Sequence, residues 1–424
     1  MEILKSDVVI IGSGVAGLSC ALNIDSDKKI ILITKKELED SNSYLAQGGI
    51  SIRKGESDRE TFIEDTMKAG HYENIKEAVE VLVDESEDAL KFLVENNVDF
   101  NREDGEILFT KEGGHSTNRI AYCDDIAGEC IMNALIAETK KRKNIEIITN
   151  AKMEDLLILD NKCYGIYAKS KDKDYKIYAG VTVLATGGMG GIYKNTTNFS
   201  HIKGDGIALA IKHGIDLRDI SYVQIHPTAL YEDSDDRRFL VSEAVRGEGG
   251  HLLNQKHERF TDELKPRDIV SSAILKEMEK DKSDYEYLDM SVIETDIKER
   301  FPNIYKKLIE IDIDPYKEPV PIVPAAHYTM GGIKVDLDGK TSAKNLYAVG
   351  EVASTGVHGK NRLASNSLLE SVVYGTRAAR SINDSKIEIE EVDADYSDLM
   401  SYEEECNMIR MRMDLDAKNK ELSN

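Results

Sequence analysis

The N-terminal segment joins an apolar strand to a glycine-rich turn, and this feature constrains the fold more than any other part of the sequence. Residues 7–11 are Asp-Val-Val-Ile-Ile, and they run directly into Gly12-Ser13-Gly14-Val15-Ala16-Gly17. In a Gly-x-Gly-x-x-Gly turn, the first glycine allows the tight turn and the second lets backbone approach a pyrophosphate. The third lets the helix pack on the strand, so that the helix N-terminus points its free N–H groups at the phosphates. The sequence therefore predicts a βαβ dinucleotide-binding unit.

The end of the second predicted strand bears on which dinucleotide is bound. After residues 30–33 the chain continues with Thr34 and Lys35. An NAD site usually has an acidic residue for the ribose hydroxyls here, roughly 20 residues beyond the glycines. Glu37 lies slightly later and could substitute, but we interpret it as a solvated turn residue. The missing acid favours a flavin protein over a simple NAD dehydrogenase.

Charge and hydropathy exclude several classes of function. Lys and Arg number 55 against 78 Asp and Glu, a net charge of −23, which repels nucleic acid and anionic membrane surfaces. The longest apolar runs, such as 8–11 and 181–185, fall far short of the ~20 residues that span a bilayer. The N-terminus lacks the pattern of a signal peptide. We therefore expect a soluble, cytoplasmic protein with no nucleic-acid or membrane partner.

The cysteines predict neither a metal centre nor an iron–sulfur cluster. Both need closely spaced thiolates, and the sequence contains no Cys-x-x-Cys pair. We expect reduced, mostly buried thiols and no metal site. The five cysteines are Cys20, Cys123, Cys130, Cys163 and Cys406.

The pattern along the chain predicts an α/β architecture. Helical periodicity covers residues 59–97 and 118–140. Short runs at 145–149, 153–159 and 162–169 predict strands of a small antiparallel layer. A buried strand at 178–185 then ends in a second glycine-rich turn, residues 186–191.

From residue 221 to 327 the amino-acid composition changes, and we interpret this stretch as an inserted domain. All seven prolines of the chain lie here, charge is denser and the βαβ rhythm is absent. Beyond it, residues 345–351 form a strand that stops at Gly350. The predicted organisation is a Rossmann-like FAD-type domain at 1–219 and 329–390, interrupted by an α+β capping domain at 220–328. The cleft between the two parts is the expected substrate site.

Two helices are predicted near the C-terminus. Ser367-x-x-Glu370 has capping-box spacing, so one helix is expected to begin near Ser367. The tail at 391–424 is expected to form one short amphipathic helix, from about Asp395, in place of a full helical domain. Its predicted packing positions are Leu399, Tyr402, Cys406, Ile409 and Met413.

Three landmarks stand in order: the turn at 12–17, the segment Ser-Asn-Ser-Tyr-Leu-Ala-Gln-Gly-Gly at 41–49, and Gly350-Glu351. This order resembles the flavoprotein family of succinate dehydrogenase, fumarate reductase and L-aspartate oxidase. The similarity continues through Gly204-Asp205-Gly206, His226-Pro227-Thr228, Arg246-Gly247-Glu248-Gly249, Pro266-Arg267-Asp268, Pro324-Ala325-Ala326-His327-Tyr328 and residues 361–367. The resemblance implies the family fold and FAD as cofactor.

Two positions depart from the membrane enzymes of that family and match its aspartate oxidases. The membrane enzymes attach FAD covalently through a histidine ahead of the Ala-Gln-Gly-Gly turn, and this chain has Asn42 there. Because an amide cannot form that bond, noncovalent FAD is implied. Glu112 stands in Lys-Glu-Gly-Gly-His, where the dehydrogenases and reductases have an apolar residue. An acid at this position is explained by a substrate ammonium.

The resemblance also implies site residues. Arg362 is expected to clamp a substrate carboxylate with two parallel hydrogen bonds, and Arg267 is placed to exchange a proton. Guanidinium keeps its proton at ordinary pH, so Arg267 is expected to donate to fumarate in the reverse direction and to act on aspartate by electrostatics. The other implied substrate residues are Glu112, Gln224, His226, Thr228, His327 and Ser365.

The implied FAD contacts include Glu351, which is expected to bind the ribityl hydroxyls, and the helix near Ser367, which is expected to face the flavin pyrimidine ring. The complete predicted set is Gly12, Ser13, Gly14, Val15, Ala16, Gly17, Lys35, Asn42, Ser43, Ala46, Gln47, Gly48, Gly49, Asp205, Glu351, Ser367 and Leu368.

The function implied by the resemblance is oxidation of L-aspartate to iminoaspartate, with O2 or fumarate as electron acceptor. Quinolinate synthase would use the product on the route to NAD. Two alternatives stay open at this point: a soluble fumarate reductase, and the flavin subunit of an electron-transfer complex. A monomer or a homodimer fits the sequence equally well.

Overall fold

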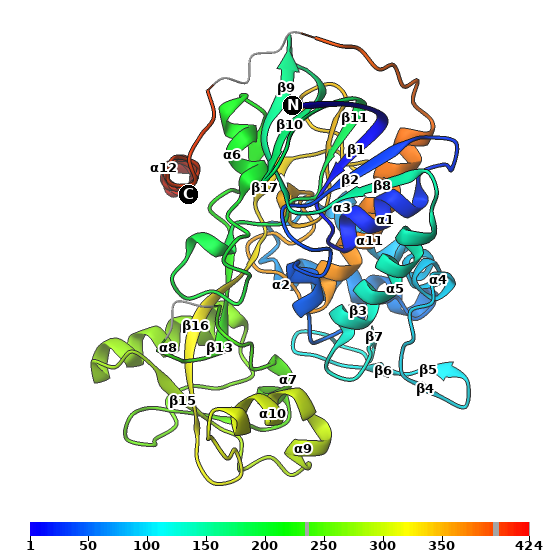
Figure 1. Cartoon of the computed structure of the whole chain (residues 1–424). Coiled ribbons are helices and arrows are strands. Elements are labelled where there is room, and N and C mark those ends of the chain that lie inside the picture. Colours follow the sequence, from blue (N-terminus) through cyan, green and yellow to red (C-terminus); the bar gives the residue numbers. More distant parts are fainter. Residues whose placement is uncertain (234–236, 393–397, 424) are drawn as a thin grey trace.

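The N-terminal strand lies at the centre of a seven-stranded sheet in the computed structural model, which describes residues 1–233, 237–392 and 398–423 (Figure 1). The order is β8-β2-β1-β11-β10-β9. The strand β18 pairs with the C-terminal part of β11, and β10 pairs with its N-terminal part. The strands are β1 (Glu2–Ile11), β2 (Ile30–Ile33), β8 (Ile145–Ile148), β9 (Ala151–Leu159), β10 (Lys162–Ser170), β11 (Asp174–Leu184) and β18 (Leu346–Ala348).

Both faces of this sheet are covered, which explains why residues 8–11 of β1 are an uninterrupted apolar run. Val8 and Ile10 belong to the hydrophobic cluster formed with one layer of helices, while Val9 and Ile11 belong to the cluster on the opposite face. The first layer contains α1 (Val15–Asn23), α5 (Ala127–Lys141) and α11 (Asn366–Asn383), and the second contains α6 (Asp205–Lys212). The predicted βαβ unit and α/β class are confirmed.

The predicted helical stretch at 59–97 is confirmed as three helices, and the first ends before His71 and Tyr72, whose φ values of 58° a right-handed helix excludes. Two other details of the predicted element pattern are wrong. Residues 118–140 are not one helix: Ile120–Ala121 is a strand, Asp124 has a φ of 45°, and α5 begins only at Ala127. β8 pairs parallel with β2 inside the main sheet, and the antiparallel β9 and β10 extend that same sheet. The helices of the first stretch are α2 (Arg59–Ala69), α3 (Lys76–Asp84) and α4 (Ser86–Glu95).

Short strands and 3-10 turns complete this part of the chain. The small sheets contain β3 (Ile50–Ser51), β4 (Arg102–Glu103), β5 (Glu106–Ile107), β6 (Phe109–Thr110), β7 (Ile120–Ala121), β12 (Leu217–Arg218), β17 (Gly332–Lys334) and β19 (Ala353–Ser354). The 3-10 turns are Asn42–Leu45, Glu56–Asp58, Gly190–Ile192 and Gly350–Val352.

The proline-rich segment builds an antiparallel sheet with a hydrophobic cluster of its own (Figure 1). The sheet order is β13-β16-β15-β14, and helices pack against it; we call residues 220–328 the inserted segment. Its elements are β13 (Val223–Leu230), α7 (Glu243–Gly247), β14 (His251–Leu253), α8 (Arg267–Asp281), β15 (Glu286–Asp289), α9 (Ile297–Arg300), α10 (Pro302–Glu310) and β16 (Val320–Thr329). The predicted domain boundaries themselves stay a prediction.

The tail forms one helix, α12 (Tyr402–Ser423), which packs on α6. Ile409 is fully buried there, and Asp416 accepts hydrogen bonds from the backbone and hydroxyl of Ser221 at 3.0 and 2.6 Å. The predicted helix start, Asp395, lies outside the described residues. Within the part of the chain that the structure describes, no helix is long and apolar enough to cross a membrane.

A buried ion-pair network fixes the loop that carries Glu112. Arg119 is fully buried and donates to Asp58 at 2.7 Å and to Asp65 at 2.5 Å. Asp65 also accepts hydrogen bonds from the backbone and hydroxyl of Ser116, at 2.7 and 2.6 Å. The network therefore ties residues 116–119 to the middle of α2 and to the turn before it.

We expect Arg119→Met to lower the free energy of unfolding by about 3–5 kcal/mol, because it leaves two buried carboxylates without their cation. Urea unfolding of the variant beside the wild type measures this loss. Arg102→Met, at an exposed arginine, is the control and should change stability little. A loss for Arg119→Met no larger than that of the control would contradict the structural role of the network.

Candidate functional site

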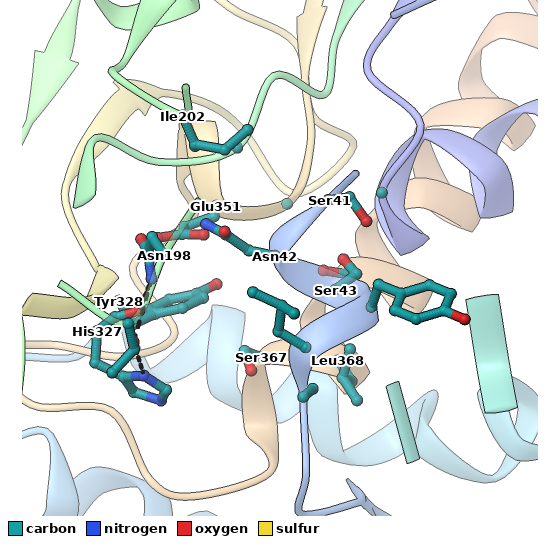
Figure 2. Close-up of a pocket in the computed structure, with 18 of the residues that line it drawn as sticks. Ser41, Asn42, Ser43, Asn198, Ile202, His327, Tyr328, Glu351, Ser367 and Leu368 are labelled. Carbon is teal, nitrogen blue, oxygen red and sulfur yellow. Dashed lines mark hydrogen bonds between the residues drawn. The ribbon is translucent and has the colours of Figure 1, made fainter. Parts of the chain in front are cut away.

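A cavity of about 400 Å³ lies between the main sheet and the inserted segment. Its walls come from the turns after β1 and β11, residues 40–49, the inserted segment and the start of α11. Figure 2 shows side chains of residues 41–43, Glu351 and the start of α11 around one hollow. The predicted residues that line it are Gly12, Ser13, Gly14, Ala16, Lys35, Asn42, Ser43, Ala46, Gln47, Gly48, Gly49, Glu112, Asp205, His226, Arg267, His327, Glu351, Arg362, Ser365, Ser367 and Leu368.

The glycine turn after β1 has no room for a side chain at Gly12 or Gly17. A Cβ at Gly12 would lie 2.1 Å from the Ala185 carbonyl oxygen, and the φ of +113° at Gly12 disfavours any other residue. A Cβ on Gly17 would lie 2.1 Å from the Gly12 oxygen. Gly17 and Val15 therefore lie behind the cavity wall and shape the cradle without lining it.

The N-terminus of α1 opens onto this cavity. Gly14 is the N-cap and provides no side-chain cap, so the first N–H groups of the helix stay available for an anion. The N–H of Val15 is the exception, because it donates to Ser43 Oγ at 3.2 Å. This arrangement fits the dinucleotide cradle that the sequence predicts.

Polar groups farther along the cavity have unused hydrogen-bonding capacity. Lys35 and Asp205 form an ion pair at 2.6 Å, yet Asp205 Oδ1 is buried without a partner among the described residues. The same holds for Asn42 Nδ2 and Gln47 Oε1. Glu37, in contrast, bonds the Asn150 side chain at 2.6 Å and does not line the cavity. Unpaired donors and acceptors beside an anion-binding helix end fit a long polar cofactor.

The start of α11 also faces the cavity, but the predicted capping box is wrong. α11 begins at Asn366, after Ser365 with a φ of 61° and no side-chain cap. Glu370 instead accepts hydrogen bonds from Thr355 at 2.5 Å, Tyr328 at 2.8 Å and His358 at 2.9 Å. Its carboxylate is thus occupied inside the core. The Asn366 N–H donates to the Leu363 carbonyl at 3.4 Å, and the next N–H groups of α11, at Ser367 and Leu368, are left for the cavity that these residues line.

Two arginines mark the other end of the cavity. Arg267 donates from Nε to Glu243 at 2.5 Å and from Nη1 to Gln224 at 2.9 Å. Arg362 lies over the Tyr328 ring at 4.8 Å, and its Nε is buried without a partner in the described parts of the chain. Burial and repulsion from Arg267 lower the pKa of Arg362 to about 10, so Arg362 is still cationic at neutral pH. Two fixed cations side by side favour an anionic ligand.

His226 and His327 add neutral donors to this end. Their ring centroids lie 5.2 Å apart, and burial together with the nearby arginines holds the pKa of both well below the usual value. Nδ1 of His226 accepts the Thr228 N–H at 3.2 Å, so its proton is on Nε2. Each ring is therefore an uncharged imidazole.

Glu112 brings an acid into the same cavity. It accepts a hydrogen bond from the Ser365 hydroxyl at 2.6 Å. Burial raises the pKa of Glu112, and the nearby Glu243 adds to that rise. A buried acid without a full counter-charge is stabilised by a cationic ligand group.

Gln224 and Thr228 do not line the cavity, although both are predicted substrate contacts. Their polar groups are engaged elsewhere: Gln224 donates to Asn361 and to the Arg362 carbonyl, each at 2.8 Å, and Thr228 donates to the Val241 carbonyl at 2.9 Å. Both are buried positioning residues behind the wall. Gln224 joins Arg267 to the Arg362 segment.

Glu243 and Tyr328 line the cavity and were not singled out by sequence reasoning. Burial raises the pKa of Glu243, but Arg267 and Arg246 outweigh this effect, so its net pKa is lowered and it stays ionised. The Glu243-x-x-Arg246 spacing on one short helix was the available signal. Tyr328 lies in a quoted motif, but nothing local predicts its bond to Glu370, 42 residues away.

Comparison with known proteins agrees with this geometry. A family model described as FAD binding domain matches residues 7–368. The L-aspartate oxidase of Clostridium perfringens is 52% identical over 380 residues, which cover 89% of this chain and 87% of that protein. The chain belongs to the FAD-binding L-aspartate oxidase family.

Further members and a solved structure support this assignment. The L-aspartate oxidase of Clostridium acetobutylicum is 50% identical over 385 residues, or 90% of this chain and 89% of that protein. A mutant of the E. coli quinol fumarate reductase chain FrdA superposes with a TM-score of 0.85 at 32% identity, covering 91% of this chain and 71% of that one. FAD is therefore the cofactor, and the glycine cradle, the free helix ends and the unpaired polar atoms fit it.

Glu351 leads to a prediction about cofactor affinity. Burial raises the pKa of Glu351 to about 7. A carboxylate accepts hydrogen bonds from sugar hydroxyls better than a carboxylic acid does, so the charged form should bind FAD more tightly. Because this form is lost as the pH falls through 7, we expect the Kd for FAD to rise toward pH 6, by at most about tenfold per pH unit.

Titration of the apoprotein with FAD between pH 6 and 8, followed by flavin fluorescence, measures this dependence. Glu351→Gln should bind FAD more weakly at pH 8 and lose most of the slope. An unchanged slope in the variant would exclude Glu351 as its origin.

Proposed function

We propose that this chain oxidises L-aspartate to iminoaspartate with FAD, and that O2 or fumarate then takes up the electrons. The observation that carries the proposal is Glu112, an acid in the same cavity as Arg267 and Arg362. Aspartate has two carboxylates and one ammonium, so its site needs donors at both ends and an anion between them. The name shared by the relatives in the two Clostridium species supports this substrate.

Each end of the substrate has its own set of donors in this proposal. The unpaired Nε of Arg362, with the adjacent Nη, offers a fork for one carboxylate. Nε2 of His226, together with His327, faces the other carboxylate. Glu112 accepts from the substrate ammonium, which replaces the positive charge that this buried acid lacks.

FAD, when bound, accepts the two electrons and the hydrogen that leave Cα. The protein orients Cα and handles charge. Arg267 stays protonated, and its ion pair with Glu243 holds it at the cavity wall. It therefore stabilises the negative charge of the substrate during aspartate oxidation, and when fumarate takes up the electrons, Arg267 is the group placed to donate a proton to fumarate.

The cofactor is proposed to bind without a covalent link. Asn42 stands where the membrane enzymes have their histidine, and its Oδ1 accepts the Phe199 N–H at 3.0 Å. A flavin subunit of a membrane complex would be expected to carry the histidine.

We also propose that quinolinate synthase consumes the product, which places the reaction on the route to NAD.

A fumarate reductase is the second candidate, because the E. coli fumarate reductase chain superposes closely and fumarate would use the same carboxylate donors. Anaerobic mixing separates the two. The purified flavoprotein is combined with L-aspartate, D-aspartate or succinate, and the flavin absorbance is followed. We expect L-aspartate alone to bleach it at a catalytically relevant rate; bleaching by succinate and not by L-aspartate would overturn the proposal.

A further inference from the structure

Two cysteines meet at the start of α5. The thiols of Cys123 and Cys130 share one acceptor, because both lie within hydrogen-bonding distance of the Asp99 carbonyl oxygen, at 3.3 and 3.5 Å. A turn and the first helical turn bring them together: the Ile126 N–H donates to the Cys123 carbonyl, and the Cys130 N–H donates to the Ile126 carbonyl, each at 3.0 Å. Two thiols that the backbone holds at one carbonyl oxygen are placed near each other, as disulfide formation requires.

The two thiols differ in the way that a redox pair requires. Cys123 is buried and Cys130 is partly exposed, so a small oxidant can reach Cys130 first. A hydrogen bond from the Cys123 thiol to the Cys130 thiolate is the main cause that lowers the pKa of Cys130 to about 7, and the Asp99 backbone adds to it, while partial burial and the negative charges of Asp99 and Asp124 oppose it. The position of Cys130 in the first turn of α5 also favours the thiolate. Cys20 and Cys163 are fully buried.

The pair lies beside the cofactor cradle. The Gly128 N–H donates to the Ala46 carbonyl at 2.8 Å, and a Cβ on Gly128 would lie 2.1 Å from the Ser43 oxygen. Asp125, between the cysteines, accepts hydrogen bonds from the backbone and side chain of Asn303 at 3.2 and 2.5 Å. The segment therefore contacts both residues 43–46, beside the cofactor cavity, and the inserted segment.

We propose that Cys123 and Cys130 are a redox-active dithiol that hydrogen peroxide converts reversibly to a disulfide. The Cys130 thiolate attacks one peroxide oxygen, the O–O bond breaks, and sulfenic acid and hydroxide form. Cys123 then attacks the oxidised sulfur, an S–S bond forms, and the hydroxyl leaves; its uptake of the Cys123 proton gives water. The two thiols lose two electrons in total, and the peroxide gains them. Thiol reductants reverse the process by exchange.

The intracellular source of peroxide rests on the proposed function, since reoxidation by O2 produces it. The chemistry at the cysteines does not depend on that step. Peroxide is therefore added directly in the test, so that a failure here is distinguishable from a failure of aspartate oxidation.

The test treats the FAD-loaded protein with hydrogen peroxide, alkylates the remaining thiols, and digests with a glutamate-specific protease. Glu129 lies between the two cysteines, so cleavage after it separates them unless a disulfide holds the fragments together. We expect joined fragments that dithiothreitol releases, and a chain mass lower by two hydrogen atoms.

Two variants make the result decisive. Cys123→Ala should abolish the joined fragments, let Cys130 proceed to the sulfinic acid, and slow its alkylation at pH 7 several-fold. Cys406→Ser, at another partly exposed thiol, is the matched control and should leave the joined fragments unchanged. Wild-type protein in which Cys130 gains only oxygen atoms while Cys123 stays open to alkylation would overturn the proposal.

Discussion

Replacing Glu112 by glutamine should lower kcat/KM for L-aspartate oxidation by about 100- to 1000-fold and change fumarate reduction by no more than a few-fold. Glutamine keeps the size of the side chain and can still accept the Ser365 hydroxyl. It removes the charge that faces the substrate ammonium, and loss of one partner of a buried charge pair costs about 2–5 kcal/mol. Fumarate has no ammonium, so it loses nothing equivalent.

Both reactions are measured on one preparation. Aspartate oxidation is followed by the reduction of an electron acceptor, and fumarate reduction is followed by the oxidation of a reduced dye. Glu129→Gln is the matched control, since Glu129 lines the same cavity at the start of α5. We expect Glu129→Gln to catalyse aspartate oxidation and fumarate reduction at wild-type rates. An equal loss of the two reactions in Glu112→Gln would show that the residue supports the site in general and does not recognise the ammonium.

The parts of the fold that local sequence determines were predictable. The strand and glycine turn at residues 2–17 specify their own conformation, because Gly12 and Gly17 have contacts that no other residue tolerates. The error over residues 118–140 has the opposite origin. Apolar spacing there fits a helix, but Asp124 takes a left-handed conformation and Ile120 pairs with Ser51, far away in sequence.

In the candidate site, too, contacts between segments that are distant in sequence could not be predicted. Most residues that the sequence motifs marked meet in the cavity, including Glu112, Arg267 and Arg362. The motifs could not show that Gln224 hydrogen-bonds Arg267 and Asn361, because its bond to Asn361 joins residues 137 positions apart. Likewise, the capping-box spacing at Glu370 is outcompeted by buried donors from other segments. Local patterns identify a side chain, and its partners are fixed only by tertiary packing.

Arg362→Lys should lower kcat/KM for L-aspartate oxidation and for fumarate reduction alike, each by about 100- to 1000-fold. Lysine keeps the positive charge, so the field in the cavity is largely preserved. It cannot supply two parallel donors, lie flat over the Tyr328 ring or reach Ser367 Oγ, to which Arg362 donates at 3.2 Å. The lost carboxylate clamp and the disturbed buried cation together cost about 3–4 kcal/mol, within the range for buried charge pairs.

Arg362→Lys and Glu112→Gln are expected to differ, because Arg362 faces a carboxylate that both substrates have and Glu112 faces an ammonium that only aspartate has. Arg259→Lys, at a surface arginine paired with Glu263 at 2.7 Å, is the control and should leave both rates unchanged. Steady-state kinetics with each substrate and the Kd for FAD are measured on all variants. If Arg362→Lys impaired only one of the two reactions, Arg362 would not hold the shared carboxylate, and the orientation proposed for the substrate would have to be reversed.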